Sequence, residues 1–191
     1  MKLMIASDIH GSAVFCEKLL ERFEDEAPER LLLLGDILYS SSASALEGGS
    51  DTRSVFGMLN AYADQIMAVR GNCDSDVDQT VLDFPITSDY IYLPWDGRMI
   101  FATHGHVYGP HRLPPVSSCD LLLCGHTHIP DFYQVRTPGE GGPGVESPCY
   151  YCNPGSVSLP KGGSSRSYMT LEDGVLQWKT LDGEVYREER I

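Results

Sequence analysis

The residues best able to do chemistry in this 191-residue chain lie in five short glycine-containing motifs. In chain order, they are D-I-H-G at 8–11, G-D at 35–36, G-N-C-D at 71–74, H-G-H at 104–106 and G-H-T-H at 125–128. From the composition of the chain, patterns such as G-N-x-D, H-G-H and G-H-x-H are each expected about 0.02 times by chance. D-x-H and G-D are weak alone, so the whole ordered set indicates a functional site.

Seven side chains in these motifs are candidate metal ligands, because carboxylate, imidazole and amide groups without thiolate suit divalent Mn, Fe or Zn. Cages for Mg or Ca use oxygen and do not need so many histidines. Seven donors exceed what one ion normally takes, whereas two ions that share a bridging carboxylate could use them all. Such a pair generates a hydroxide nucleophile and holds a phosphoryl group from both sides. The candidates are Asp8, His10, Asp36, Asn72, His104, His126 and His128.

Short apolar segments of strand length precede the motifs, at 2–6, 30–34, 65–69, 98–103 and 120–124. Apolar residues recur at helical spacing over 12–26, where Ser12 is placed to cap the helix, and over 51–63. Alternating strands and helices predict right-handed crossovers onto a largely parallel sheet. The carboxyl ends of such strands line one edge, where ligands bind, so we expect the motifs to meet there.

The last third of the chain has a different pattern. Extended segments at 132–136, 149–152, 167–171 and 175–181 are separated by turn residues, which predicts antiparallel hairpins. Two segments rich in Ser, Gly or Pro, at 40–51 and 137–148, are expected to be solvated connections. The alternative is that one of them borders the active site or a subunit contact. Residues 1–191 are long enough for one domain with an ordinary core.

The ordered motifs resemble the pattern of the calcineurin-like metallophosphoesterases, which reads D-x-H, G-D, G-N-H-D/E, H and G-H-x-H. G-N-C-D, T-H-G-H at 103–106, and N-P-G-S at 153–156 followed by P-K-G-G at 160–163 are similar to the small bacterial YfcE-type phosphodiesterases of the Vps29-like group. The resemblance covers nearly the whole chain. It implies an α/β fold, a four-layer α/β/β/α sandwich with two mixed sheets and a metal site at the C-terminal ends of the strands.

The resemblance also implies how the ligands are divided. Asp8, His10 and His128 would hold one ion, whereas Asn72, His104 and His126 would hold the other. Asp36 would bridge both ions. The cofactors would be two divalent metal ions, most often Mn²⁺, with Zn²⁺, Fe²⁺ or Ni²⁺ as alternatives.

Two positions depart from the wider pattern. Cys73 stands where the superfamily has a histidine that is proposed to act on the leaving group, and a thiol is a poor general acid. The site is therefore expected to favour good leaving groups, or to use His106 or a metal for charge compensation. Tyr39 stands at the second acidic position of G-D-x-x-D, so another group must support the first metal.

Residues beside the ligands have competing interpretations. His106 is predicted to contact the phosphate or support a ligand, with simple packing as the alternative. Asp74 either caps a helix or orients a ligand. His111 has no motif around it and is interpreted as a surface or loop histidine, and 153–156 is interpreted as a turn rather than a phosphate cradle.

These interpretations favour an enzyme, a dinuclear metal-dependent phosphodiesterase. A hydroxide bridging the two ions would attack phosphorus, and Asn72 with the metals would stabilise the developing charge. The resemblance to Vps29 leaves a non-catalytic binding scaffold as the alternative from another class, and a phosphomonoesterase as another kind of enzyme. The complete set of seven donors favours catalysis, because clustering carboxylates and imidazoles without a metal is costly.

Charge limits the partners. The chain has 14 Lys and Arg against 27 Asp and Glu, a net charge of −13, which argues against stable binding to nucleic acid or an anionic membrane. A small phosphodiester substrate is expected instead, and a homo-oligomer is compatible with the sequence. With no export signal recognised, we expect a cytoplasmic protein with reduced thiols. Cys149 and Cys152 are three apart in an extended segment and should point to opposite faces, which is poor geometry for a shared metal.

Overall fold

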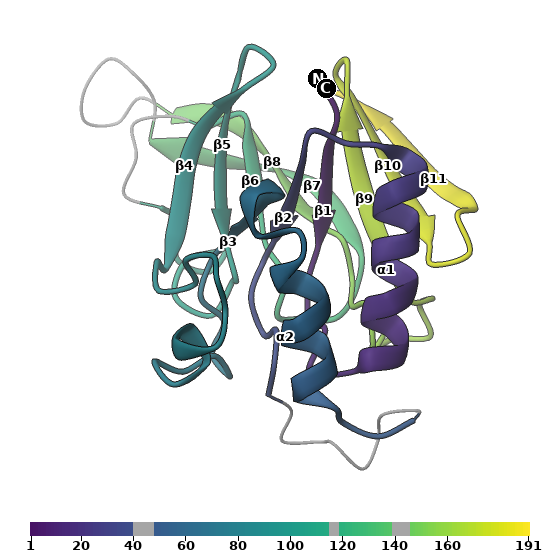
Figure 1. Cartoon of the computed structure of the whole chain (residues 1–191). Coiled ribbons are helices and arrows are strands. Elements are labelled where there is room, and N and C mark those ends of the chain that lie inside the picture. Colours follow the sequence, from purple (N-terminus) through teal and green to yellow (C-terminus); the bar gives the residue numbers. More distant parts are fainter. Residues whose placement is uncertain (40–47, 115–118, 139–145) are drawn as a thin grey trace.

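The computed structural model describes residues 1–39, 48–114, 119–138 and 146–191 (Figure 1). The expected connections at 40–51 and 137–148 lie largely outside the described residues. Two α-helices, two 3₁₀ turns and eleven strands are described, and no described helix is long and apolar enough to cross a membrane. The elements are β1 (Leu3–Ala6), α1 (Ala13–Glu26), β2 (Arg30–Leu33), α2 (Thr52–Asn60), η2 (Ala63–Gln65), β3 (Ile66–Ala68), η3 (Asp78–Thr80), β4 (Tyr90–Trp95), β5 (Arg98–Thr103), β6 (Leu121–Leu123), β7 (Asp131–Pro138), β8 (Glu146–Asn153), β9 (Ser167–Glu172), β10 (Val175–Thr180) and β11 (Val185–Arg190).

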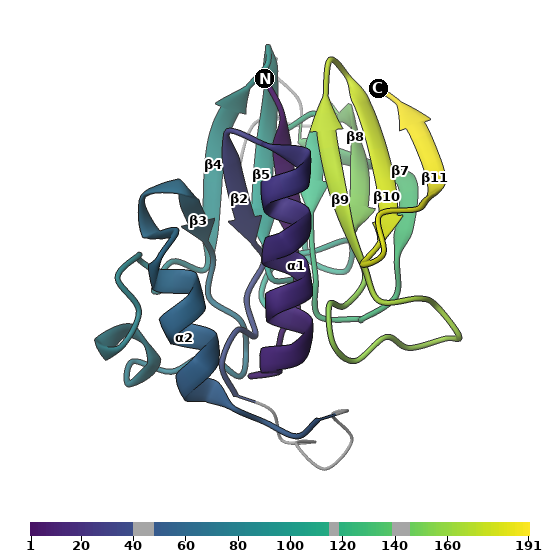
Figure 2. The same ribbon diagram turned by 45° about the vertical axis from the view of Figure 1, so that its right-hand side comes forward.

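The first sheet has the order β11-β10-β9-β1-β2-β3. β1, β2 and β3 are parallel, as predicted for strands joined through helices, and β9, β10 and β11 are antiparallel. Both helices lie on one face of this sheet (Figure 2), where their apolar residues pack against Met4, Leu31 and Leu33. The predicted helices are confirmed, and so are the antiparallel strands near 167–171 and 175–181.

The helix starts differ from the expectation at one point. Ser12 is at the N-cap position of α1, but its side chain makes no capping hydrogen bond and is buried. Asp51 caps α2, because its Oδ1 accepts from the backbone N–H of Ser54 at 3.1 Å. Ser12 therefore predicted where α1 begins, but the capping hydrogen bond expected of its hydroxyl group is not formed.

The second sheet has the order β4-β5-β6-β8-β7. β5, β6 and β8 are parallel, and β4 and β7 are antiparallel edge strands. The largely parallel sheet predicted from the residues therefore holds for the first three predicted strands, whereas the next two belong to another sheet. The two mixed sheets implied by the family resemblance are confirmed. β4 and β11 were not predicted. β11 (V-Y-R-E-E-R) lacks a continuous apolar segment, whereas β4 (Y-I-Y-L-P-W) has one but contains a proline, which is rare in strand interiors.

The two sheets pack face to face around an apolar core that includes Ile5, Leu32, Ile100 and Leu123. Within the described part of the chain, no helix covers the outer face of the second sheet. Tyr108, from the segment after β5, packs on that face against Phe101 with ring centroids 5.8 Å apart. Among the described residues, helices thus cover only the outer face of the first sheet. The segment after β5 packs on the outer face of the second sheet, where a second helical layer was expected.

The six cysteines are unpaired thiols in the structure. Cys149 lies in the cluster on the outer face of the second sheet, whereas Cys152 lies in the core between the sheets. The prediction that these two thiols point to opposite faces is confirmed, and it follows from the alternation of side chains along β8.

A partly buried ion-pair network ties the end of α1 to β1 and β10. The carboxylate of Glu26 accepts hydrogen bonds from Lys179 at 2.6 Å, from Lys2 at 3.1 Å and from Tyr168 at 3.0 Å. Burial alone would raise the pKa of Glu26, but these three donors bring the pKa below its usual value. The network therefore stabilises the fold only while Glu26 is ionised.

We expect Glu26→Gln to lower the free energy of unfolding at neutral pH by about 2 kcal/mol. Because the folded-state pKa is lowered, the stabilisation is complete above the unfolded pKa of about 4.3 and is lost as the pH falls through the folded value. Urea unfolding at neutral pH and below about pH 4 should show the difference between wild type and variant shrinking in acid. Glu29→Gln, an exposed neighbour, serves as the control. A difference that stays constant with pH would contradict the role of the charge.

Candidate metal centre

The five motifs meet although their strands belong to two sheets. Asp8, Asp36 and Asn72 follow β1, β2 and β3 of the first sheet, whereas His104 and His126 follow β5 and β6 of the second. The C-terminal ends of both sets of parallel strands therefore lie at the same end of the sandwich.

Left-handed backbone conformations are concentrated in these turns. The φ angles of five candidate ligands are positive, between 53° and 68°, at Asp8, His10, Asp36, His126 and His128. This conformation is costly for residues other than glycine and is common where function requires a fixed geometry. Gly71 and Gly125 are needed because the backbone packs closely against neighbouring side chains. A Cβ at Gly71 would overlap the Asp36 carboxylate, and one at Gly125 would overlap the side chain of Ser7.

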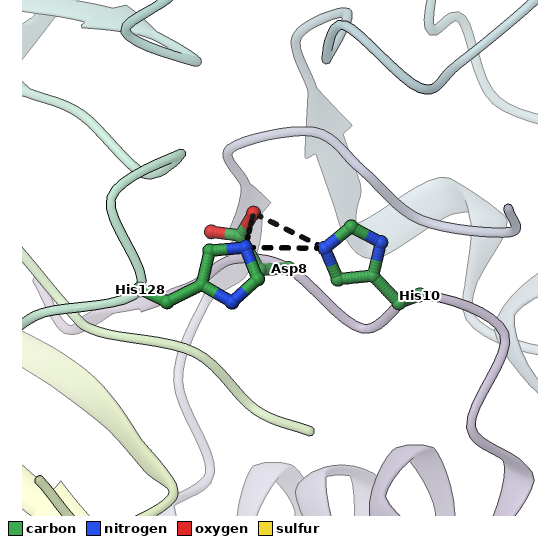
Figure 3. Close-up of side chains that lie close together, drawn as sticks. All are labelled: Asp8, His10 and His128. Carbon is green, nitrogen blue, oxygen red and sulfur yellow. Dashed lines mark hydrogen bonds and ion pairs between the residues drawn. The ribbon is translucent and has the colours of Figure 1, made fainter. Parts of the chain in front are cut away.

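The first cluster joins Asp8, His10 and His128 (Figure 3), whose ligand atoms all lie within 4.8 Å of one another. Asp8 Oδ1 is 3.3 Å from His128 Nε2 and 3.6 Å from His10 Nε2, and the two Nε2 atoms are 3.3 Å apart. The three residues grouped by the sequence analysis around one ion are therefore neighbours in space.

A second group, made of Asp36, Asn72, His104 and His126, adjoins the first cluster through Asp36. Asp36 Oδ2 is 3.7 Å from His10 Nε2 and 3.4 Å from His104 Nε2. His104 Nε2 is also 3.0 Å from Asn72 Oδ1, and the ring of His126 lies 5.0 Å from the ring of His104. Asp36 Oδ2 therefore lies within 3.7 Å of a ring nitrogen from each of the two groups.

The three buried histidines are oriented alike by main-chain carbonyls. The Nδ1 atoms of His10, His104 and His128 donate to the carbonyl oxygens of Tyr39, Leu34 and Leu159, at 2.8, 2.6 and 2.6 Å. A carbonyl only accepts, so each neutral ring carries its proton on Nδ1 and presents a free lone pair at Nε2. Metal-binding histidines are commonly oriented in this way. The support that the sequence analysis could not locate at position 39 is thus the backbone carbonyl of Tyr39.

The carboxylates are charged despite their burial. Burial would raise the pKa of both carboxyl groups, but His10 and His128 hold the pKa of Asp8 far below its usual value, and His104 lowers the pKa of Asp36. Asp8 Oδ2 accepts from the backbone N–H of His126, whereas Oδ1 is buried without a hydrogen-bond partner among the described residues. A buried, negatively charged oxygen without a donor, facing free imidazole nitrogens, fits a cation.

Asp74 orients the loop that carries Asp36. Its two carboxylate oxygens accept from the backbone N–H groups of Asp36, Ile37 and Gly71, at 2.8, 2.8 and 2.7 Å. Of the two interpretations left open by the sequence, the structure favours orientation of a ligand, since these bonds join the turns after β2 and β3. Asp36 and Ile37 lie 38 and 37 positions from Asp74 in the sequence, so no local motif could indicate the bonds to them.

Cys73 also faces the centre. Its backbone N–H donates to Asp36 Oδ1 at 2.8 Å, and its Sγ belongs to a group with ligand atoms of His10 and Asp36 that lie within 4.8 Å of one another. Burial and the neighbouring Asp36 raise the pKa of this thiol to about 12, so it is protonated at neutral pH. From the sequence, Cys73 was interpreted only as a replacement for the histidine that acts on the leaving group, and its position beside the ligands was not predicted.

Residues 153–159 form the scaffold of the site. The hydroxyl groups of Ser156 and Ser158 donate to the Asp8 carbonyl at 2.9 and 3.0 Å, and Asn153 Nδ2 donates to the Gly125 carbonyl at 2.8 Å. These side chains are buried and bonded to backbone, so the predicted turn is a brace for two ligand loops. N-P-G-S was noticed in the sequence, but its partners were not.

Two further histidines lie next to the ligands. His106 is half-buried, its ring is 5.3 Å from that of His104, and its Nδ1 is buried without a hydrogen-bond partner in the described part of the chain. His111 is exposed on a loop, as predicted. However, His106, His111 and His126 line one hollow of about 270 Å³ beside the centre, a proximity that no motif around His111 indicated.

Comparison with known proteins agrees with this architecture. Phosphodiesterase YfcE of Escherichia coli K12 is 43% identical over 176 residues, covering 92% of this chain and 90% of that protein. The solved structure of the phosphoesterase YfcE from E. coli covers 100% of both chains with 40% identity and a TM-score of 0.86. Zn²⁺-bound Vps29 of Entamoeba histolytica shares the fold, with a TM-score of 0.60 at 20% identity over 100% of this chain and 98% of that one. Residues 1–173 match the calcineurin-like phosphoesterase superfamily domain, and the chain belongs to that superfamily.

Proposed function

We propose that the protein is a phosphodiesterase that uses two divalent metal ions. The observation that carries the proposal is the joint orientation of His10, His104 and His128, whose Nδ1 atoms are engaged by carbonyls while their Nε2 atoms face Asp8 and Asp36. The 43% sequence identity to phosphodiesterase YfcE supports an ester of phosphoric acid as the substrate.

The described geometry fits a division of ligands between two ions. Asp8, His10 and His128 would hold one, Asn72, His104 and His126 the other, with Asp36 shared. When bound, such ions lower the pKa of water and offset the charge of a phosphoryl group. Mn²⁺ suits this set of oxygen and imidazole ligands, as do Zn²⁺, Fe²⁺ and Ni²⁺.

Asn72 and His106 are the side chains that we assign to the substrate. Asn72 is exposed, and its amide nitrogen contacts only the Cys73 sulfur, at 3.2 Å, among the described residues. This nitrogen is therefore free to donate to a phosphoryl oxygen as charge develops. Burial and the neighbouring His104 lower the pKa of His106, so its ring is neutral at neutral pH and offers a hydrogen bond rather than a charge.

Metal removal should destabilise the protein. The Asp8, Asp36 and Asp74 carboxylates gather at the strand ends, and two divalent ions would offset their repulsion. We expect chelation to lower the melting temperature by several degrees and added Mn²⁺ to restore it. Differential scanning calorimetry after verified metal removal tests this. An unchanged melting temperature would contradict the assignment.

The alternative is a binding scaffold like Vps29, which the fold alone does not distinguish from an enzyme. Retention of all seven donors with their orienting hydrogen bonds favours the enzyme. Metal analysis of protein purified without chelator, followed by hydrolysis of bis-p-nitrophenyl phosphate and p-nitrophenyl phosphate, separates the functions. We expect bound metal and faster hydrolysis of the diester; metal-free, inactive protein would support the scaffold, and a preference for the monoester would support a phosphomonoesterase.

A further inference from the structure

The hollow beside the candidate metal centre has walls from both sides of the turn after β6. His106, Pro110 and His111 come from the segment after β5, His126 and Thr127 from the turn, and Tyr151 from β8. The volume of about 270 Å³ equals roughly nine water molecules at about 30 Å³ each. It can hold one small ring, but not a nucleic-acid or peptide chain.

The lining is aromatic and free of carboxylates. Three imidazole rings and one phenol ring contribute to it, and none of the described lining residues is Asp, Glu, Lys or Arg. The net charge of −13 and the Asp8 and Asp36 carboxylates repel an anion, and a lining without carboxylates adds no further repulsion to an anionic ester. Flat faces favour stacking of another ring.

The walls are held in place. Tyr151 is 4% exposed, its hydroxyl accepts from Asn153 Nδ2 at 3.1 Å, and its ring lies 4.7 Å from that of Tyr133. His111 belongs to a tight turn in which Gly109 and Arg112 exchange backbone hydrogen bonds of 2.9 and 3.1 Å. A prearranged hollow loses little conformational entropy when a ligand binds.

Building on the phosphodiesterase function proposed above, we propose that this hollow binds one ester group of the substrate and selects an aromatic or heteroaromatic ring. His111 is then a specificity-determining residue, because its ring forms part of the wall and lies outside the set of candidate metal ligands. This gives a role to a residue that the sequence indicated only as a surface or loop histidine.

Binding of product-like monoesters tests the inference without relying on turnover. Isothermal titration calorimetry of the full chain with Mn²⁺ would compare inorganic phosphate, methyl phosphate and phenyl phosphate. We expect phenyl phosphate to bind about ten-fold more tightly than methyl phosphate. His111→Ala should remove most of that preference and leave the affinity for phosphate unchanged, whereas His111→Phe should retain it. Leu113→Ala, in the same segment but outside the lining, is the control.

Each other result has a definite meaning. Equal affinities of methyl and phenyl phosphate for wild type would overturn the inference, as would a uniform loss of affinity for all three ligands in His111→Ala. If wild type hydrolyses bis-p-nitrophenyl phosphate but shows no preference for phenyl phosphate, only the hollow has been misassigned. If neither hydrolysis nor binding of inorganic phosphate is detected, the proposed function fails, and this inference fails with it.

Discussion

Replacing Asp36 by asparagine is expected to reduce turnover of a phosphodiester to less than about a tenth of the wild-type value, with little change in the fold. Asp36 Oδ2 lies 3.7 Å from His10 Nε2 and 3.4 Å from His104 Nε2, so its charge serves both clusters. Asparagine keeps one oxygen to accept from the Cys73 N–H and tolerates the positive φ of 53° at this position. The change therefore removes charge while preserving the loop.

Steady-state kinetics, metal content and melting temperature should be measured together for this variant. We expect fewer bound ions per chain as well as lower turnover, because the proposed bridging carboxylate would hold both ions. Asp76→Asn is a matched control, since the Asp76 side chain is 87% exposed and pairs with Arg70. Turnover above about a tenth of wild type, a loss smaller than 1.36 kcal/mol in the barrier, would show that Asp36 does not bridge.

Replacing Cys73 by histidine is expected to accelerate hydrolysis of esters with poor leaving groups, by ten-fold or more. A general acid typically contributes about 10² to 10⁴, so even an imperfectly placed imidazole should be detectable. The Cys73 sulfur already faces His10 and Asp36, and its raised pKa of about 12 makes the thiol a poor proton donor at neutral pH. Good leaving groups need no proton and should gain little.

A series of aryl phosphodiesters with increasing leaving-group pKa tests this expectation. If the imidazole donates a proton, the rate should depend less steeply on leaving-group pKa in Cys73→His than in wild type. Cys73→Ser, which is small and lacks an acid with a suitable pKa, should keep the wild-type slope. An unchanged slope with a uniform loss of rate in Cys73→His would mean that the new ring displaces a ligand or captures a metal.

The sequence alone determined which donor groups the candidate site can offer. The types and order of the donors predicted all seven candidate ligands, and the structure brings their turns together at one end of the sandwich. The proximity of these turns was predictable because each motif follows a strand, and the position of a strand end is a local property of the chain. The helices α1 and α2 were predictable for the same reason, since their apolar residues recur at helical spacing.

Sheet membership was decided by tertiary structure. A segment such as 98–103 has the same apolar character whether it joins β1, β2 and β3 or begins a second sheet. Pairing depends on partners that are distant in sequence, and an edge strand such as β11 is largely exposed and carries a weaker apolar pattern. The residue pattern therefore predicted strands without predicting that they form two sheets.

The supporting bonds of the site likewise came only from the structure. Asp74 binds three backbone N–H groups, and Tyr39 and Leu159 orient histidines through their carbonyls. Backbone groups are the same in every residue, so the sequence carries no signal for such partners. The sequence thus determined which atoms are available for chemistry, whereas the tertiary structure decided which of them face one another, because that depends on long-range packing and on main-chain hydrogen bonds.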